Sequence, residues 1–563
     1  MNRLYYGDNL TLMERMPSAS VDLIYLDPPF KSNQNYNLIY KTLTGRPVPE
    51  QAEAFCDTWE MDAEKEKLAK TMPILMREKG VEDYYVEFWR LWMQALRQTQ
   101  PHLLAYLVYM VQRLLYMKTL LRPRGSIYLH CDPEASHYIK VMMDGIFGHQ
   151  NFRNEIVWKR TSAHSDTKRW GAVHDTILFY STSDKFTWNP IYLAHDKDYL
   201  EKFYRFKDEQ GVYRLHEIIR TASMGPRRNL AYEYKGYTPQ WGWRRVRSKV
   251  EALDKAGRIT WSKTGRPYLK RYLHEQEGTP ITDVVVDIPP VGGVAKERLG
   301  YPTQKPIALL KRIIESSSPK DAVVFDPFCG CGTTIYAAHE TGRKWVGCDI
   351  AILAIKLIRE ILTERYRLHE EANFTVDGIP VSVEQAQELF NKDPFQFQHW
   401  AVERIGGFPM QKKVADQGID GRLYFETKKT IKSMVLSVKG GTIRPTDVRD
   451  LRGVLERETD AELAGFISLR EPTTAMKSEA AKAGMYDYAG VSYPRIQLLT
   501  IREIVGDKRD FQTPTKVGSR IATGQAVLPM EGVTYQPRKR REIPLAAEGK
   551  GLYGLSDSED EPF

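Results

Sequence analysis

Val21-Asp22-Leu23-Ile24-Tyr25-Leu26-Asp27-Pro28-Pro29-Phe30 is the stretch of this 563-residue chain that decides its fold. Its β-branched and aromatic residues predict a buried strand, and two prolines, which lack an N–H and fix φ, end that strand at Asp27. Open α/β sheets bind ligands at the carboxyl ends of their strands. The corner therefore offers the Asp27 carboxylate, the Pro28 carbonyl and the Phe30 ring to a planar base with an exocyclic amino group. The alternative is an ordinary proline-rich strand exit.

A second informative strand, 322–325, leads into Asp326-Pro327-Phe328-Cys329-Gly330-Cys331-Gly332-Thr333-Thr334. A strand, a glycine turn and a helix start together let a ligand approach the backbone closely. The next strand, 344–347, is followed shortly by Asp349. The interval from Asp326 to Asp349 is close to the roughly 20-residue offset at which an acid binds a ribose hydroxyl in nucleotide-binding units. The pair of strands predicts a nucleotide-like cofactor.

Strands and helices alternate in the segments around these two stretches. We expect a strand at 3–6, a turn at Gly7-Asp8-Asn9, a helix over 91–121, a strand at 126–130, a helix over 135–147 and a strand near 156–158. Such alternation predicts a parallel, helix-covered sheet of the α/β class.

The charge and composition of the chain limit the kinds of partner that it can bind. The chain carries a net charge of +9, and residues 225–272 hold thirteen Lys or Arg against three acids, with eight aromatic residues among them. Cations bind phosphates and aromatic rings stack on bases, so this region predicts a nucleic-acid surface. A solvated basic face whose aromatic residues form a small core of their own is the alternative. Five cysteines without zinc spacing indicate neither a disulfide framework nor a structural zinc.

No membrane association is expected. The most apolar stretch, 103–121, is interrupted by Gln112, Arg113 and Lys118, which a membrane span tolerates poorly. The first residues lack the apolar core of a signal peptide. We therefore interpret 103–121 as a core helix.

Taken together, these motifs resemble the β class of amino-group DNA methyltransferases, which use S-adenosylmethionine. The segment 27–30 is similar to their catalytic motif IV, 326–332 to the cofactor motif I and 301–306 to motif X, while Gly7-Asp8 matches motif III and Asp349 matches motif II. The resemblance implies a permuted Rossmann-like methyltransferase domain with an inserted target-recognition region. It also implies double-stranded DNA as the partner and a cytoplasmic protein of a bacterium or archaeon.

The resemblance assigns roles to individual residues. The catalytic residues are Asp27, Pro28, Pro29 and Phe30. The cofactor-binding residues are Asp8, Thr303, Gln304, Lys305, Pro306, Asp326, Pro327, Phe328, Gly330, Gly332, Thr333 and Asp349. The DNA-binding residues that we expect in the basic region are Arg227, Arg228, Arg244, Arg245 and Arg247.

The base that accepts the methyl group is open at this point. In the family, Asp rather than Ser at position 27 favours adenine N6, and cytosine N4 is the alternative. A DNA-binding protein on a decayed methyltransferase scaffold is a further alternative, against which the intact motif residues argue. The oligomeric state is also open, with a homodimer as a candidate.

The chain begins a second pattern after His369. We expect helices at 382–391 and 395–405 and a strand at 434–439, with Asp420 before it and Lys439 at its end. This segment resembles Mrr-type restriction endonucleases, which implies a smaller α/β domain with Glu403, Asp420 and Lys439 in the nuclease site and Mg²⁺ on Asp420. Ser437 departs from the family pattern, which has Glu or Gln there, so a module that only binds DNA or a partner is the alternative.

The predicted domains follow from these motifs. The methyltransferase domain spans 1–160 and 296–370, the target-recognition region 161–295 and the endonuclease-like domain 371–512. Residues 513–563 form a tail that we expect to be largely disordered, because it is punctuated by Pro and Gly and carries runs of like charge.

Overall fold

The computed structural model describes residues 2–29, 59–161, 170–292, 295, 297–299, 304–410, 418–427 and 430–514. The predictions for Phe30, for Thr303 and for the tail therefore lie outside the described residues, apart from 513 and 514.

One mixed sheet organises the part of the chain that ends at Asp377. Among the described residues it has nine strands in the order β12-β4-β5-β3-β2-β13-β14-β1-β15. The strands are β1 (Asn2–Tyr6), β2 (Val21–Leu26), β3 (Leu121–Cys131), β4 (Phe152–Lys159), β5 (His174–Ser181), β12 (Val284–Val285), β13 (Val323–Asp326), β14 (Lys344–Asp349) and β15 (Phe374–Asp377).

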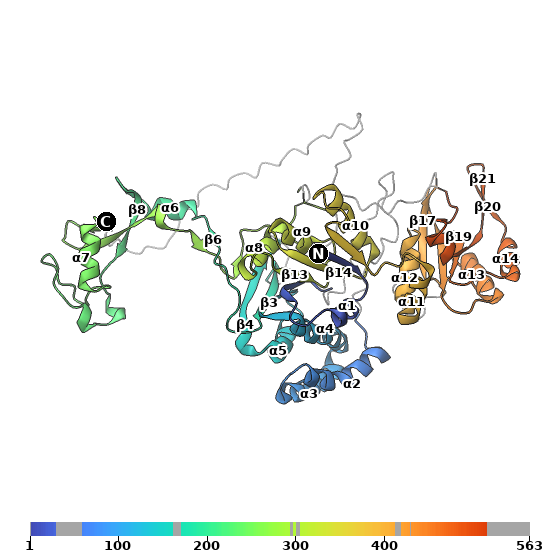
Figure 1. Cartoon of the computed structure of the whole chain (residues 1–563), viewed down its shortest axis with the longest axis horizontal. Coiled ribbons are helices and arrows are strands. Elements are labelled where there is room, and N and C mark those ends of the chain that lie inside the picture. The colour runs from blue at the N-terminus through green and yellow to red at the C-terminus, as the bar shows by residue number, and fades with distance from the viewer. Residues whose placement is uncertain are drawn as a thin grey trace, which may run out of the picture. The chain divides into compact units, whose positions relative to one another are not determined.

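The strands from β15 to β3 in this order are all parallel, while β5 runs antiparallel to β3 and β4. Figure 1 shows the N-terminus close to β13 and β14, which come from much later in the chain, and β1 pairs with β14. Parallel pairing gives the carboxyl ends of β1, β2, β13 and β14 a common edge of the sheet.

Helices cover both faces of this sheet. Ile24 and Leu26 of β2 belong to a hydrophobic cluster with α3 to α5, while Tyr25 belongs to a second cluster with α8 to α10. This alternation follows from the two-residue period of a strand. The helices are α1 (Asn9–Arg15), α2 (Ala63–Glu78), α3 (Asp83–Thr99), α4 (Pro101–Leu120), α5 (Ser136–Phe147), α8 (Ile307–Ser317), α9 (Thr333–Glu340) and α10 (Ile352–Glu364).

The structure corrects one element and two boundaries. The helix predicted over 91–121 is two helices, because Pro101 cannot extend α3 and instead begins α4. β5 pairs with β3, so the main sheet continues past residue 160 into the predicted recognition region. β15 pairs with β1, so the same sheet also continues past residue 370.

The predicted recognition region has its own small sheet and core. The sheet has the order β7-β8-β10-β9, and Trp243, which is fully buried, packs with Ile218, Val250 and Leu269. The elements are β6 (Tyr192–Leu193), α6 (Lys197–Phe203), β7 (Phe206–Asp208), β8 (Gly211–Glu217), α7 (Arg247–Lys255), β9 (Ile259–Trp261), β10 (Pro267–Tyr272) and β11 (Thr279–Pro280).

The C-terminal segment forms a second α/β sheet in the order β16-β17-β18-β19-β22. β16, β17 and β18 are antiparallel neighbours, and β18, β19 and β22 are parallel. The elements are α11 (Val383–Lys392), α12 (Pro394–Arg404), β16 (Phe408–Pro409), β17 (Gly421–Glu426), β18 (Ile431–Lys439), α13 (Pro445–Arg457), β19 (Ala461–Ser468), α14 (Thr474–Ala481), β20 (Met485–Tyr488), β21 (Val491–Pro494), β22 (Ile496–Thr500) and α15 (Ile501–Val505).

The α/β class predicted for the chain is confirmed by these two sheets, whereas the restriction-endonuclease assignment of the second one stays a prediction. Among the described residues, no helix has the length and apolar character that a bilayer crossing requires.

Candidate active site

The strand ends bring four predicted acids to one edge of the sheet. Asp27 follows β2, Asp326 ends β13, Asp349 ends β14 and Asp8 lies two residues after β1. Because β2 and β13 are parallel neighbours, two motifs that lie far apart in the sequence are next to each other in space. Charge interactions with Asp27 and Asp349 both contribute to the raised pKa of Asp326.

The glycine turn after β13 requires a glycine at position 332. Gly332 has φ +87°, and a Cβ there would lie 2.8 Å from Ile358 Cγ1. The Asp326 carboxylate accepts a hydrogen bond from the Phe328 N–H (3.0 Å), and the Asp349 carboxylate accepts one from the Gly330 N–H (2.8 Å). The two acids thus fix the turn from both sides, as a nucleotide-type site requires.

Burial changes the titration of these two acids. It raises the pKa of Asp326 to about 7, although hydrogen bonds from Thr334 and the Phe328 N–H oppose the shift. It raises the pKa of Asp349 to about 6, against hydrogen bonds from the N–H groups of Ala351, Gly330 and Ile350. Both acids therefore change protonation state close to neutral pH.

Arg113 is a site residue that motif reasoning missed. Its guanidinium, almost fully buried, donates to Asp8 Oδ2 (2.8 Å) and to Asn9 Oδ1 (2.7 Å) and lies 3.4 Å from the centre of the Tyr109 ring. Asn9 in turn donates to the Pro327 carbonyl (2.9 Å). The signal in the sequence is a lone arginine in an apolar helix, which by itself argues only against a membrane span.

Lys305 lies at Asp27, the predicted catalytic acid. The motif resemblance predicts a cofactor role for it, and the structure places its Nζ 2.5 Å from Asp27 Oδ2, with the lysine side chain 7% and the aspartate side chain 19% exposed. Pro28 is buried beside it, and Pro29 is half-buried. This buried lysine therefore fixes the orientation of the Asp27 carboxylate.

A buried series of hydrogen bonds begins at Tyr25, on the strand that leads into the corner at Asp27. Tyr25 donates to His130 Nδ1 (2.9 Å), and His130 Nε2 donates to Asp175 (3.1 Å), which also pairs with Arg160. Burial and the nearby Lys305 lower the pKa of His130, so its ring is neutral and can accept from Tyr25. Burial tends to raise the pKa of Asp175, but its hydrogen bond and charge contacts lower it overall.

The remaining predicted cofactor residues have structural partners. Gln304 accepts from the Leu299 N–H (2.8 Å) and donates to the Glu297 carbonyl (2.6 Å), and Pro306 precedes α8. The Phe328 ring lies 6.4 Å from that of Tyr109, and the Thr333 hydroxyl contacts Cys331 Sγ (3.5 Å). Gln304 therefore holds its own loop together.

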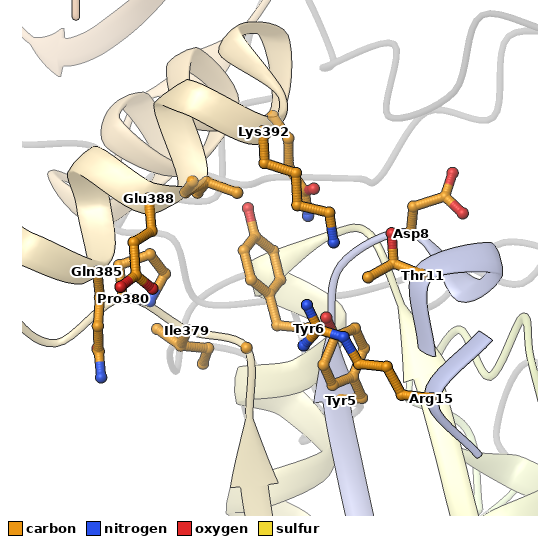
Figure 2. Close-up of a pocket in the computed structure, with 13 residues that line it drawn as sticks. Tyr5, Tyr6, Asp8, Thr11, Arg15, Ile379, Pro380, Gln385, Glu388 and Lys392 are labelled. Carbon is orange, nitrogen blue, oxygen red and sulfur yellow. The ribbon is translucent and has the colours of Figure 1, made fainter. Parts of the chain in front are cut away.

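A pocket of about 380 Å³ opens beside Asp8, between β1 with α1 and the helices α11 and α12. Figure 2 shows Lys392 extending from α11 toward Asp8 and Thr11, with the Tyr6 ring below it. Of the predicted cofactor residues, Asp8 alone lines this pocket, so the pocket lies next to the predicted site and not within it.

The basic region divides into a core and a charged surface. Its aromatic residues mostly build the small core around Trp243, as the second of the two interpretations predicts. Arg227, Arg228 and Arg245 are exposed, whereas Arg247 pairs with Glu251 and Arg244 donates to the Ile219 carbonyl. Within the described residues, no ion pair involves the three exposed arginines.

The register of the small sheet brings together two further arginines, which the sequence alone did not single out. Arg214 on β8 lies directly opposite Arg271 on β10, and like charges so placed repel each other. Burial lowers the pKa of the neighbouring His216, and Arg271, Arg214 and Arg244 lower it further. This cluster is therefore suited to an anionic ligand such as a phosphate.

The structure places the predicted nuclease residues in two different regions. Asp420 accepts from the Val438 N–H (2.6 Å), which brings it close to the end of β18, where Lys439 lies. Glu403 instead accepts from the Ile352 N–H (3.1 Å) at the start of α10, in the first domain. Among the residues that the structure describes, there is no group of three or more His, Cys, Asp or Glu that could hold a metal ion.

Sequence comparison connects this geometry with known proteins. The family model described as DNA methylase matches residues 21–360. The type II methyltransferase M.EcaI of Enterobacter cloacae is 34% identical over 261 residues, which cover 45% of this chain and 56% of that protein. The Mod subunit of the type III restriction-modification enzyme StyLTI of Salmonella typhimurium is 28% identical over 375 residues, which cover 62% and 52%. The chain thus spans little more than half the length of these two relatives.

More distant similarities are to an Escherichia coli protein and to solved structures. The DNA adenine methyltransferase YhdJ is 22% identical over 355 residues, which cover 63% of this chain and 80% of YhdJ. TTHA0409 of Thermus thermophilus, solved with S-adenosyl-L-methionine, is 15% identical with a TM-score of 0.31, and the match covers 68% of this chain and 100% of that one.

Proposed function

Because the chain belongs to the DNA methylase family, we propose that it transfers a methyl group from S-adenosylmethionine to adenine N6 at a specific site in double-stranded DNA. The observation that carries this proposal is the common edge at which the corner at Asp27 lies next to the glycine turn at Gly330. The named relatives support modification within a restriction-modification system.

The residues of the edge fit the cofactor. The glycine turn leads into the N-terminus of α9, where backbone N–H groups can bind a polar ligand. Asp349 can accept hydrogen bonds from ribose hydroxyls, and Asp8 lies at the end of the adjacent strand. Bound there, S-adenosylmethionine would supply an electrophilic methyl group. The protein holds these groups in place before the ligand arrives, because Arg113 ties Asp8 to α4 and Asn9 ties α1 to the turn.

The catalytic corner acts by positioning. A target base must leave the duplex before its amino group can reach the corner. The Asp27 carboxylate and the Pro28 carbonyl then accept its two amino hydrogens, which orients the nitrogen lone pair, and Phe30 would stack on the ring. Lys305 holds one oxygen of Asp27, so the other oxygen serves the base. Orientation of this kind supplies a large part of a rate enhancement.

Tritium transfer tests the activity. Purified protein with tritiated S-adenosylmethionine and unmethylated DNA should label the DNA, and Asp27→Ala should reduce labelling by at least about 1000-fold, as expected for loss of a group that positions the reacting atom. Binding of S-adenosylmethionine by Asp27→Ala, measured by calorimetry, should stay within about threefold of wild type. Full labelling by the variant would refute the role of Asp27, and no labelling by wild type would favour the decayed scaffold.

The choice of adenine rests on the resemblance at Asp27, so cytosine N4 stays the alternative. Mass spectrometry of nucleosides from the labelled DNA separates the two bases. We expect 6-methyladenine, and 4-methylcytosine without 6-methyladenine would overturn the choice.

A Mg²⁺-dependent nuclease is a second candidate function, for the C-terminal domain alone. The contact of Asp420 with Val438, next to Lys439, favours it, while Ser437 and the distant bond of Glu403 favour a non-cleaving module. Unmethylated plasmid incubated with Mg²⁺ should be cut by the wild type and not by Lys439→Ala. Equal cutting by both, or none, would remove the nuclease and leave the binding module.

A further inference from the structure

Helix α12 belongs to the C-terminal domain but packs against the first domain. Phe397 and Trp400, both fully buried, lie in the same hydrophobic cluster as Tyr6 of β1 and Ile352 and Ile355 of α10. A shared core of this kind holds two domains in a fixed relation more firmly than a polar interface does. The helix is therefore placed to affect the strand ends that these residues adjoin.

Glu403 of α12 completes a cap that Asp349 begins. Asp349 accepts from the N–H groups of Gly330 (2.8 Å) and Ala351 (2.9 Å), and Glu403 accepts from the next N–H, that of Ile352 (3.1 Å). The first N–H groups of a helix have no partner within the helix, so a carboxyl group there fixes the helix start. Glu403 thereby fixes the segment that carries Asp349.

A second contact of α12 reaches the loop after β1. A Cβ on Gly7, whose φ is +140°, would lie 3.1 Å from Nε2 of Gln396, itself only 8% exposed. The Gly7 N–H donates to the Asp349 carbonyl (2.9 Å). Glu403 and Gln396 therefore lie beside two different segments that hold Asp349, the start of α10 and the loop at Gly7.

The groups around Glu403 determine its protonation state. Lys356 of α10, Asp349 at the end of β14 and the hydroxyl of Tyr6 on β1 interact with it electrostatically. Burial raises the pKa of Glu403 to about 8, with Asp349 adding to the shift and the Ile352 N–H and Lys356 opposing it. At neutral pH the group is mostly a neutral acid, and a glutamine can replace its acceptor oxygen.

We propose that Glu403 and Gln396 are positioning residues of the cofactor site, so that cofactor binding and the packing of α12 are energetically coupled. The C-terminal domain thereby senses whether the methyltransferase site is loaded. Coupling of this kind is reciprocal: whatever α12 contributes to cofactor affinity, the cofactor contributes to the packing of α12. A pocket lined by Gln396 and Lys392 lies on one side of this interface.

Calorimetric titration of S-adenosylmethionine into the full chain tests the proposal, which rests on the proposed function. Glu403→Ala should weaken binding about tenfold, the equivalent of about 1.4 kcal/mol, because Ile352 loses its acceptor. Glu403→Gln should stay within about threefold of the wild type, since it keeps that acceptor. Glu471→Ala removes an exposed acid from the same domain and should change nothing.

Hydrogen exchange supplies a second readout that does not depend on activity. S-adenosylmethionine should slow exchange of the amides of 397–404 in the wild type and in Glu403→Gln, but not in Glu403→Ala. If Glu403→Ala fails to fold, Gln396→Ala takes its place in both measurements.

The outcomes distinguish the two proposals. A wild-type protein that binds no S-adenosylmethionine refutes the proposed function and this inference together. A wild-type protein that binds it, beside alanine variants with unchanged affinity and no cofactor-dependent protection of α12, refutes the inference alone.

Discussion

At the scale of single residues, the pairing of Lys305 with Asp27 changes what the sequence motif implies. The motif resemblance assigns Lys305 to the cofactor, whereas its Nζ contacts the carboxylate of Asp27, the predicted catalytic acid. His130, beneath it, is kept neutral by burial, which lowers its pKa, and by the same lysine. The corner is therefore a buried network and not a lone acid.

Lys305→Met should lower kcat about 10- to 100-fold, because Asp27 loses the buried charge that orients it. The dissociation constant of S-adenosylmethionine should stay within about twofold. Single-turnover kinetics and calorimetry measure the two quantities separately. Lys311→Met, on the helix that follows Lys305 and paired with Glu340, is the matched control. A large loss of cofactor affinity with unchanged kcat would return Lys305 to the cofactor site.

The affinity for S-adenosylmethionine should fall as the pH drops from 8 to 5. Burial raises the pKa of Asp349 to about 6, so below that value the acid that we propose as acceptor of the ribose hydroxyls becomes protonated. Well below pH 6 the dissociation constant should rise by up to about tenfold per pH unit. Asp349→Asn should bind S-adenosylmethionine weakly, and its dissociation constant should no longer rise steeply below pH 6. Asp326→Asn removes the group whose pKa is about 7 and should keep the rise below pH 6. An equally steep profile in Asp349→Asn would contradict the assignment.

At the scale of elements, the predicted recognition region uses its aromatic residues for a core and its arginines for a charged surface. Aromatic residues of the region pack around Trp243. We propose that its arginines bind an anionic ligand, at Arg227, Arg228 and Arg245 and in the cluster of Arg214, Arg244 and Arg271. Antiparallel pairing of β8 and β10 brings Arg214 and Arg271 together from distant positions in the sequence.

Replacing Arg214 and Arg271 by Ala should weaken DNA binding on all sequences alike. If both arginines bind phosphates, the slope of log affinity against log salt should decrease by about 0.9 for each phosphate that is no longer neutralised. Fluorescence anisotropy at several salt concentrations measures the slope. Lys235→Ala is the control, because that lysine already pairs with Asp254. An unchanged slope in the double variant would exclude the cluster from the DNA interface.

At the scale of the whole molecule, Glu403 connects two domains that the sequence presents as independent. A carboxylic acid that the motif assigns to a nuclease site instead caps α10 of the first domain. Glu403 therefore belongs to the interface between the two domains.

Glu403→Gln should stabilise the protein increasingly between pH 5 and pH 8. The folded pKa of about 8 lies above the ordinary value of 4.5, so the folded chain holds a proton that the unfolded chain has lost. The free energy of unfolding that depends on Glu403 therefore falls as pH rises through this window. Urea denaturation at pH 5 and at pH 8 measures the difference, and Glu471→Gln, an exposed site, should show none. A constant difference between the variant and the wild type would place Glu403 in solvent-like surroundings.

The sequence by itself determined the α/β class, the strand that ends at Asp27 and the glycine turn at Gly330. These depend on local physics: β-branched residues form strands, prolines end them, and glycine permits the backbone of a tight turn. The family resemblance then followed from the order of such local motifs.

Only the tertiary structure decided which side chains meet. The Lys305–Asp27 pair, the Arg113–Asp8 pair, the opposed arginines and the cap from Glu403 to Ile352 all join residues far apart in the chain. The physical reason is that strand order and helix packing set these distances, whereas local propensity fixes only the element on which each residue lies.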